Sequence, residues 1–127
     1  MKKVISTELA PKAIGPYSQG IVFGELVFLS GQIPVDPATG EIVTGEDPIV
    51  AQTHQSMTNI KNILASQDLN FDNVIKSTVF ITDMNDFPKV NEVYASYFGK
   101  TYPARSCVQV AKLPKGALVE IEVIAHK

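Results

Sequence analysis

The amino-acid sequence predicts an α+β protein of two layers, in which two helices pack on one face of a mixed β-sheet. Strand-like and helical segments are interleaved along the chain, and each predicted helix has one apolar stripe. The last strands alternate apolar with polar residues, so only one sheet face needs a covering layer. The 127 residues contain no repeat or linker, and we expect residues 1–127 to form a single domain.

Short strands and a loop are predicted in the N-terminal third of the chain. We expect an edge strand at residues 3–6 and a hairpin formed by residues 21–23 and 26–29. The hairpin turn is Gly24-Glu25, with glycine first, as a type II′ turn prefers. Residues 36–40 contain the proline and glycine that are typical of a loop.

Two helices are predicted in the central part of the chain. The first begins at Asp47-Pro48, because aspartate is a good N-cap and proline suits the first helical position. Its apolar residues recur at helical spacing as far as Leu64. The second helix covers residues 87–98, with Asp86 as its cap and Gly99 ending it in the left-handed conformation.

Three further strands complete the predicted sheet, at residues 74–82, 103–110 and 118–125. The residues expected to face the helices are Ile75, Val79, Ile81, Ser106, Val108, Val110, Val119, Ile121, Val123 and Ala125. Arg105 and Glu120 are then expected together on the opposite face, among apolar groups that include Phe28, Phe80 and Ile124. Such a mixed face is typical of a subunit interface, and we expect a homo-oligomer.

Composition excludes several classes of protein. The net charge of −2 and the lack of a basic stripe argue against a nucleic-acid partner, and no apolar run is long enough to span a membrane. The single cysteine, Cys107, cannot form an internal disulfide, which favours a reducing, cytoplasmic location. The two histidines are isolated from each other and from other metal ligands, so we expect no metal site.

Arg105 and Glu120 are the residues most informative about function. Each is a charged side chain inside an apolar strand, and burying an unpaired charge is costly. One interpretation is a structural ion pair between strands or subunits, and on spacing alone it is the better one. The other is a site in which the arginine fork binds a carboxylate and the glutamate acts as a base.

Four stretches of the chain resemble the RidA/YjgF family, also called the L-PSP family. The stretch around Arg105 reads Pro103-Ala104-Arg105-Ser106-Cys107-Val108 and continues through Leu113-Pro114 to Val119-Glu120-Ile121-Glu122. The other three are Ile14-Gly15-Pro16-Tyr17-Ser18-Gln19, Ser30-Gly31-Gln32-Ile33-Pro34 and Val90-Asn91-Glu92-Val93-Tyr94. The resemblance extends over nearly the whole chain, and these stretches occur in the family's order.

The resemblance implies a fold, an assembly and a reaction. Members of the family have a chorismate-mutase-like α+β fold and form homotrimers with active sites in the clefts between subunits. They hydrolyse reactive 2-imino acids, or enamine tautomers of the 2-aminoacrylate and 2-aminocrotonate type, to 2-oxo acids and ammonia. They need no metal or organic cofactor, so the expected partners are a small-molecule substrate and two further copies of the chain, without nucleic acid or membrane.

The resemblance also implies a role for each of the two charged residues. Arg105 would anchor the substrate carboxylate through two hydrogen bonds, because a guanidinium and a carboxylate have matching planar geometry. Glu120 would hold and deprotonate the attacking water and then help to return a proton to the departing ammonia.

Each remaining candidate residue has a structural alternative. Tyr17 would close the pocket or simply pack, and Ser30 and Gly31 would bind substrate or form an ordinary turn. Asn91 would contact the site or its support, or lie on the helix surface. Cys107 is expected to line the pocket and to position water through its carbonyl rather than act as a nucleophile, because no histidine is near in sequence.

Two functions of other classes compete with the deaminase. A regulatory protein would bind a 2-oxo acid in the same arginine pocket without turnover, although Glu120 has no necessary task in it. A nuclease is the other, and it is disfavoured by the net charge of −2.

Overall fold

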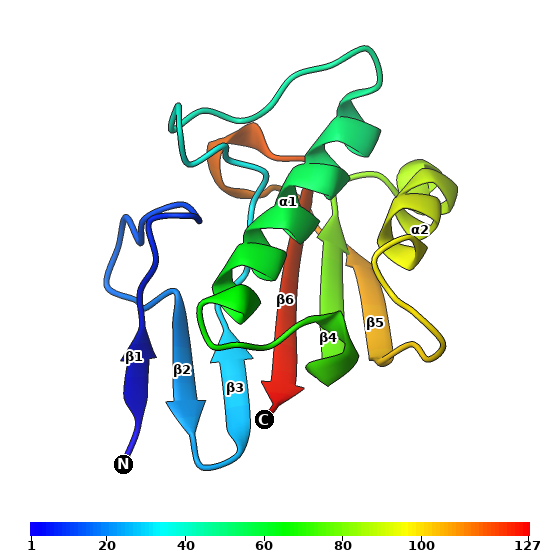
Figure 1. Ribbon diagram of the computed structural model, residues 1–127. Helices are drawn as coiled ribbons and strands as arrows, with labels where there is room; N and C mark the ends of the chain where they lie inside the picture. The colour runs from blue at the N-terminus through cyan, green and yellow to red at the C-terminus, as the bar shows by residue number, and fades with distance from the viewer.

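The computed structural model describes residues 1–127 as a two-layer α+β structure, which confirms the predicted fold class (Figure 1). The strands are β1 (Lys3–Ile5), β2 (Gly20–Phe23), β3 (Leu26–Leu29), β4 (Val74–Ile81), β5 (Ala104–Gln109) and β6 (Val119–His126). They form one six-stranded sheet in the order β1-β2-β3-β6-β4-β5. Only β4 and β5 are parallel, so the sheet is mixed and β5 is an edge strand.

Both predicted helices are present, and the start of the first is as expected. Helix α1 (Pro48–Ala65) begins at the predicted proline, and Asp47 has the extended backbone of a cap. The Asp47 side chain makes no capping hydrogen bond, because its carboxylate pairs with Lys89 of the second helix at 2.8 Å. Neither α1 nor α2 (Phe87–Ala95) combines the length and apolar character that a membrane-spanning helix needs.

The ends of α2 differ from the prediction at both sides. A short 3₁₀ turn over Met84–Asp86 precedes it, and the cap hydrogen bond comes from Asp83 to the Asn85 N–H rather than from Asp86. After Ala95 the chain continues in tight turns, with Phe98 N–H donating to the Ala95 carbonyl. These hydrogen bonds, each between residues three apart, satisfy the last carbonyl groups of the helix. Gly99 therefore does not adopt the predicted left-handed conformation.

The core lies between the helices and one face of the sheet. Residues without solvent exposure include Met57, Ile60, Ile63, Leu64, Val79, Ile81, Val119 and Ile121. Helix α1 crosses over β6, and α2 lies over the end of the sheet formed by β4 and β5 (Figure 1). The other face has no covering layer, and Phe28 and Val108 on it are 38% and 42% exposed.

The register of β5 overturns one prediction about the site. Its parallel pairing sets Arg105 opposite Ser77 and Cys107 opposite Val79, and both partners are buried under the helices. Side chains of paired residues share a face of the sheet, so Arg105 and Cys107 point toward the helices. The prediction placed Arg105 and Cys107 on the open face and Ser106 and Val108 toward the helices. It was wrong because the alternation of inward and outward residues in β5 is shifted by one position.

Glu120 lies on the open face, as predicted, because it pairs with Phe80 and alternates with the buried Val119 and Ile121. Arg105 and Glu120 therefore lie on opposite faces of the sheet, and the prediction that they share one face was wrong. A second local error concerns β4, where an irregularity between Val74 and Lys76 leaves Ile75 exposed. Ser77 takes the inward position instead.

Candidate active site

Arg105 is held between strand β5 and helix α2. Its Nη1 donates a 2.7 Å hydrogen bond to Oδ1 of Asn91. Its guanidinium carbon lies 5.0 Å from the ring centroid of Tyr94 and 5.4 Å from that of Phe87, within the range of cation–π attraction. The Tyr94 ring is itself fixed by a 2.5 Å hydrogen bond between its hydroxyl and Ser77 of β4. The arginine is thus oriented by three side chains, and Ser77 fixes one of them.

No carboxylate neutralises this arginine. The only ion pair in the chain joins Lys89 to Asp47, so the intrachain Arg105–Glu120 pair is not formed. Asn91 engages one nitrogen of the guanidinium, and the structure gives its remaining N–H groups no partner. Arg105 lines a hollow with Asn91, Tyr94, Ala95, Tyr102 and Pro103. An exposed fork of donors at the wall of a hollow is an anchor for a planar anion.

Cys107 lies beside this hollow without lining it. Its side chain packs against the core below α2. Burial raises the pKa of the thiol, and the nearby charge of Arg105 only partly offsets that effect. The thiol is therefore protonated at neutral pH, which is unfavourable for a nucleophile.

Glu120 lies against Gly31 on the open face of the sheet. After β3 ends, the backbone of Gln32 exchanges hydrogen bonds with Ile121 of β6, at 2.8 and 3.2 Å, and this pairing carries Gly31 alongside Glu120. A β-carbon at residue 31 would lie 2.5 Å from Oε2 of Glu120, so any larger residue would displace the carboxylate from this position.

The environment of Glu120 suits a base. Burial raises the pKa of its carboxyl group, and the neighbouring charge of Glu122 raises it further. The structure gives the carboxylate no hydrogen-bond donor and no cation. A half-buried carboxylate with a raised pKa and free oxygens is a better proton acceptor than an ordinary exposed carboxylate.

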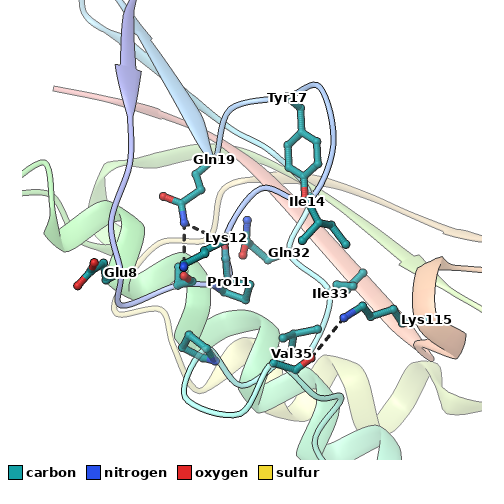
Figure 2. A pocket seen from close by; sticks show the side chains of 14 residues that line it. Glu8, Pro11, Lys12, Ile14, Tyr17, Gln19, Gln32, Ile33, Val35 and Lys115 are labelled. Atoms are coloured by element: carbon teal, nitrogen blue, oxygen red, sulfur yellow. Dashed lines mark hydrogen bonds between the residues drawn. The ribbon is translucent and has the colours of Figure 1, made fainter.

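Tyr17, Ser30 and Gly31 line a second hollow together with Glu120. The Ser30 hydroxyl donates a 2.5 Å hydrogen bond to the Ser18 carbonyl, and the Ser30 N–H donates to Gln19. Ser30 thereby fixes the loop that carries Tyr17, whose ring is half exposed and projects from that loop (Figure 2). The hydroxyl proton of Ser30 is used within the chain, and only its lone pairs remain for a ligand.

The seven predicted site residues thus fall into two groups. The arginine half contains Arg105, Asn91 and Cys107, on the helix side of the edge strand β5. The glutamate half contains Tyr17, Ser30, Gly31 and Glu120, on the open face. No residue lines both hollows.

Comparison with known proteins identifies the family. Residues 7–127 match the model of the family described as endoribonuclease L-PSP. The chain belongs to this family. It is 58% identical to a RutC family protein of Pyrococcus horikoshii over all of this chain and 99% of that one. It is 49% identical to the 2-iminobutanoate/2-iminopropanoate deaminase of Salmonella typhimurium, over 98% of each chain.

A solved structure of another relative confirms the fold. The crystal structure of Escherichia coli TdcF with bound serine superposes with a TM-score of 0.93 and is 52% identical, covering 98% of each chain. The RidA/YjgF resemblance and the chorismate-mutase-like α+β fold are therefore confirmed.

Two residues, Phe87 and Tyr94, were not anticipated from the sequence as contacts of Arg105. Tyr94 was named only within the stretch Val90-Asn91-Glu92-Val93-Tyr94 that resembles the family. Phe87, Asn91 and Tyr94 stand at i, i+4 and i+7, which places them on one face of α2. That spacing, considered together with Arg105 at the start of the next strand, is the sequence signal that would have identified Phe87 and Tyr94 as contacts of the arginine.

Proposed function

We propose that this L-PSP protein is a hydrolytic deaminase that converts reactive 2-imino acids, or their enamine tautomers, to 2-oxo acids and ammonia. The observation that carries the proposal is Arg105, a partly buried guanidinium with aromatic support and no carboxylate partner. A free arginine fork suits a substrate with a planar carboxylate next to the reacting carbon. The deaminase name of the Salmonella relative agrees with this substrate class.

In the proposed reaction, Arg105 fixes the substrate carboxylate and Glu120 manages the water. The water oxygen forms a bond to the C=N carbon while Glu120 takes one of its protons and the C=N electron pair moves to nitrogen. Glu120 then returns its proton to nitrogen, which gives a tetrahedral amino alcohol. The C–N bond breaks as the hydroxyl proton is transferred to the departing nitrogen, and this leaves a 2-oxo acid and ammonia. The raised pKa of Glu120 favours both transfers, because a base is most effective when its pKa is near the working pH.

The separation of the two halves supports a site shared between subunits. Arg105 and Glu120 lie on opposite faces of the sheet, and their hollows have no residue in common. We propose that Arg105 of one subunit faces Glu120 of a neighbouring one, in a homotrimer with closed rotational symmetry. The uncovered sheet face, where Phe28 pairs with Ile124 and Val108 is exposed, supplies apolar surface for such a contact.

The proposed activity is tested with an imine generated in the assay. A pyridoxal-phosphate dehydratase releases 2-aminoacrylate from serine, and semicarbazide traps the imine as it forms. If the protein hydrolyses the imine, free pyruvate appears faster and less semicarbazide adduct accumulates, whereas Arg105→Ala has no such effect. A protein that binds pyruvate or 2-oxobutanoate but leaves the adduct yield unchanged would be a regulatory 2-oxo-acid-binding protein instead.

A further inference from the structure

A cavity of about 250 Å³ lies between the loop of residues 8–19 and the loop of residues 31–40 (Figure 2). It is distinct from the arginine hollow, and its floor is apolar, with Ile33 and Val35 among the lining residues. Polar side chains line it as well: Glu8, Lys12, Tyr17, Gln19, Gln32 and Lys115. This volume is sufficient for a small organic molecule.

Gln32 presents an unused acceptor to this cavity. The residue is only 5% exposed, and its Nε2 donates to the Ser30 carbonyl at 3.2 Å, but the structure gives its Oε1 no donor. Gln19 in the same wall differs, because its Oε1 accepts from the Thr7 N–H and its Nε2 donates to the Pro11 carbonyl. The Gln32 oxygen has no partner within the chain and is not fully buried, so it is available at the cavity to a hydrogen-bond donor of a ligand.

Lys115 brings a positive charge to the opposite side of the cavity (Figure 2). Its φ of 57° is in the left-handed region, which disfavours residues with a β-carbon. The turn therefore places a lysine where glycine would be easier, and this fixes the point from which the side chain reaches the cavity. Its ammonium makes one long hydrogen bond, 3.3 Å to the Gly40 carbonyl, and keeps its other protons free.

The charges around the cavity favour a ligand with a single negative charge. Lys12 and Lys115 contribute two positive charges and Glu8 contributes one negative charge. We propose that this cavity is a second ligand site that binds a small monocarboxylate bearing a hydroxyl or similar donor. The carboxylate pairs with Lys115 and Lys12, the donor bonds to Gln32, and the apolar chain packs on Ile33.

Occupancy of this site has a consequence for the glutamate half. Ile14, Tyr17, Gly31 and Ile33 line both this cavity and the hollow that contains Glu120. A ligand packed against the shared wall restrains the loop that carries Tyr17, so it changes turnover there. Only this consequence rests on the proposed deaminase function; the binding itself does not.

Binding is tested by NMR on the Arg105→Ala protein, in which the other carboxylate anchor is absent. The probe is 4-hydroxybutanoate, and butanoate is the control that lacks the hydroxyl. We expect saturable shifts at the backbone amides of Val35 and Gly40 and at the Gln32 side-chain amide, with butanoate binding more weakly. In Gln32→Leu the two probes should bind equally, because the acceptor is gone.

A matched pair of glycine variants isolates the lysine. Lys115→Gly keeps the left-handed turn but loses the ammonium, and should weaken binding about tenfold or more, the factor for one charge-assisted hydrogen bond. Asp68→Gly changes the only other non-glycine residue at positive φ, 59°, and should leave binding unchanged. Absence of saturable shifts at the cavity, or equal binding by Lys115→Gly and its control, would overturn the proposal.

Discussion

Arg105 is held by a hydrogen bond and two aromatic rings, whereas the Glu120 carboxylate packs beside Gly31 and makes no hydrogen bond. Asn91, Tyr94 and Phe87 fix the guanidinium in one orientation before any ligand arrives. The Glu120 side chain packs beside the α-carbon of Gly31, and its carboxylate accepts no hydrogen bond from the chain. The difference matches two tasks: a binding group gains from preorganisation, while a proton-transfer group needs free oxygens and a raised pKa.

Loss of the arginine should give the largest effect on turnover. Arg105→Ala should reduce imine hydrolysis to background, because the substrate loses its orienting contact. Arg105→Lys should recover little, since a single ammonium cannot reproduce the bidentate fork or the stacking on Tyr94. Steady-state assays with circular dichroism as a check on folding measure both variants. Full activity of the lysine variant would show that the anchor needs only charge.

Loss of the glutamate should give the next largest effect and separate catalysis from binding. Glu120→Gln keeps the shape of the side chain and removes the base, so turnover should fall about 10²–10⁴-fold. Binding of 2-oxobutanoate, measured by calorimetry, should be retained, because the arginine half is intact. If binding is lost together with turnover, Glu120 belongs to the anchor and the two halves do not have separate tasks.

The raised pKa of Glu120 predicts a pH dependence of both activity and stability. The base must be ionised, so kcat/KM should fall as the pH drops through a value above the ordinary 4.5. The folded state holds this proton more tightly than the unfolded chain does, so the group destabilises the protein as the pH rises through that same range. Glu120→Gln should therefore be at least as stable at pH 7, and a lower melting temperature there would contradict the assigned direction.

The smallest effect is expected at Cys107, beside the arginine. Cys107→Ser should keep most of the activity, because the protonated thiol packs on the core and does not line the hollow. Stability should fall by about 1 kcal/mol, the usual scale for a half-buried polar substitution. Kinetics and thermal unfolding measure the two quantities. A folded but inactive Cys107→Ser protein would point to covalent chemistry and reverse the roles of the two halves.

Features that depend on neighbouring residues in the sequence were predicted correctly. The start of α1 at Pro48 and the glycine at the β2–β3 turn, with φ of 61°, were both correct. The facing of β5 was wrong because β5 is an edge strand whose residues alternate weakly in burial. Its register is set by pairing with β4, where Val79 opposes Cys107, and no periodicity within residues 104–110 contains that information.

Prediction of the candidate site had the same limit. The sequence identified both charged residues, but their distribution over opposite faces depends on the β5 register and could not be seen. The aromatic support of Arg105 depends on where α2 packs, which is a tertiary feature. Sequence motifs therefore indicated the residues of the candidate site, whereas tertiary packing determines which of these residues are in contact within one chain.

The central claim, that one site takes Arg105 and Glu120 from different subunits, is tested most directly by mixing two inactive variants. Arg105→Ala and Glu120→Gln are unfolded together, refolded as an equal mixture and assayed, with each variant refolded alone as the control. If neighbouring subunits share each site, random assembly pairs an intact arginine with an intact glutamate in about a quarter of the sites, and about that fraction of wild-type activity returns. If the mixture stays as inactive as its components while forming the same oligomer, each site lies within a single subunit and the account is contradicted.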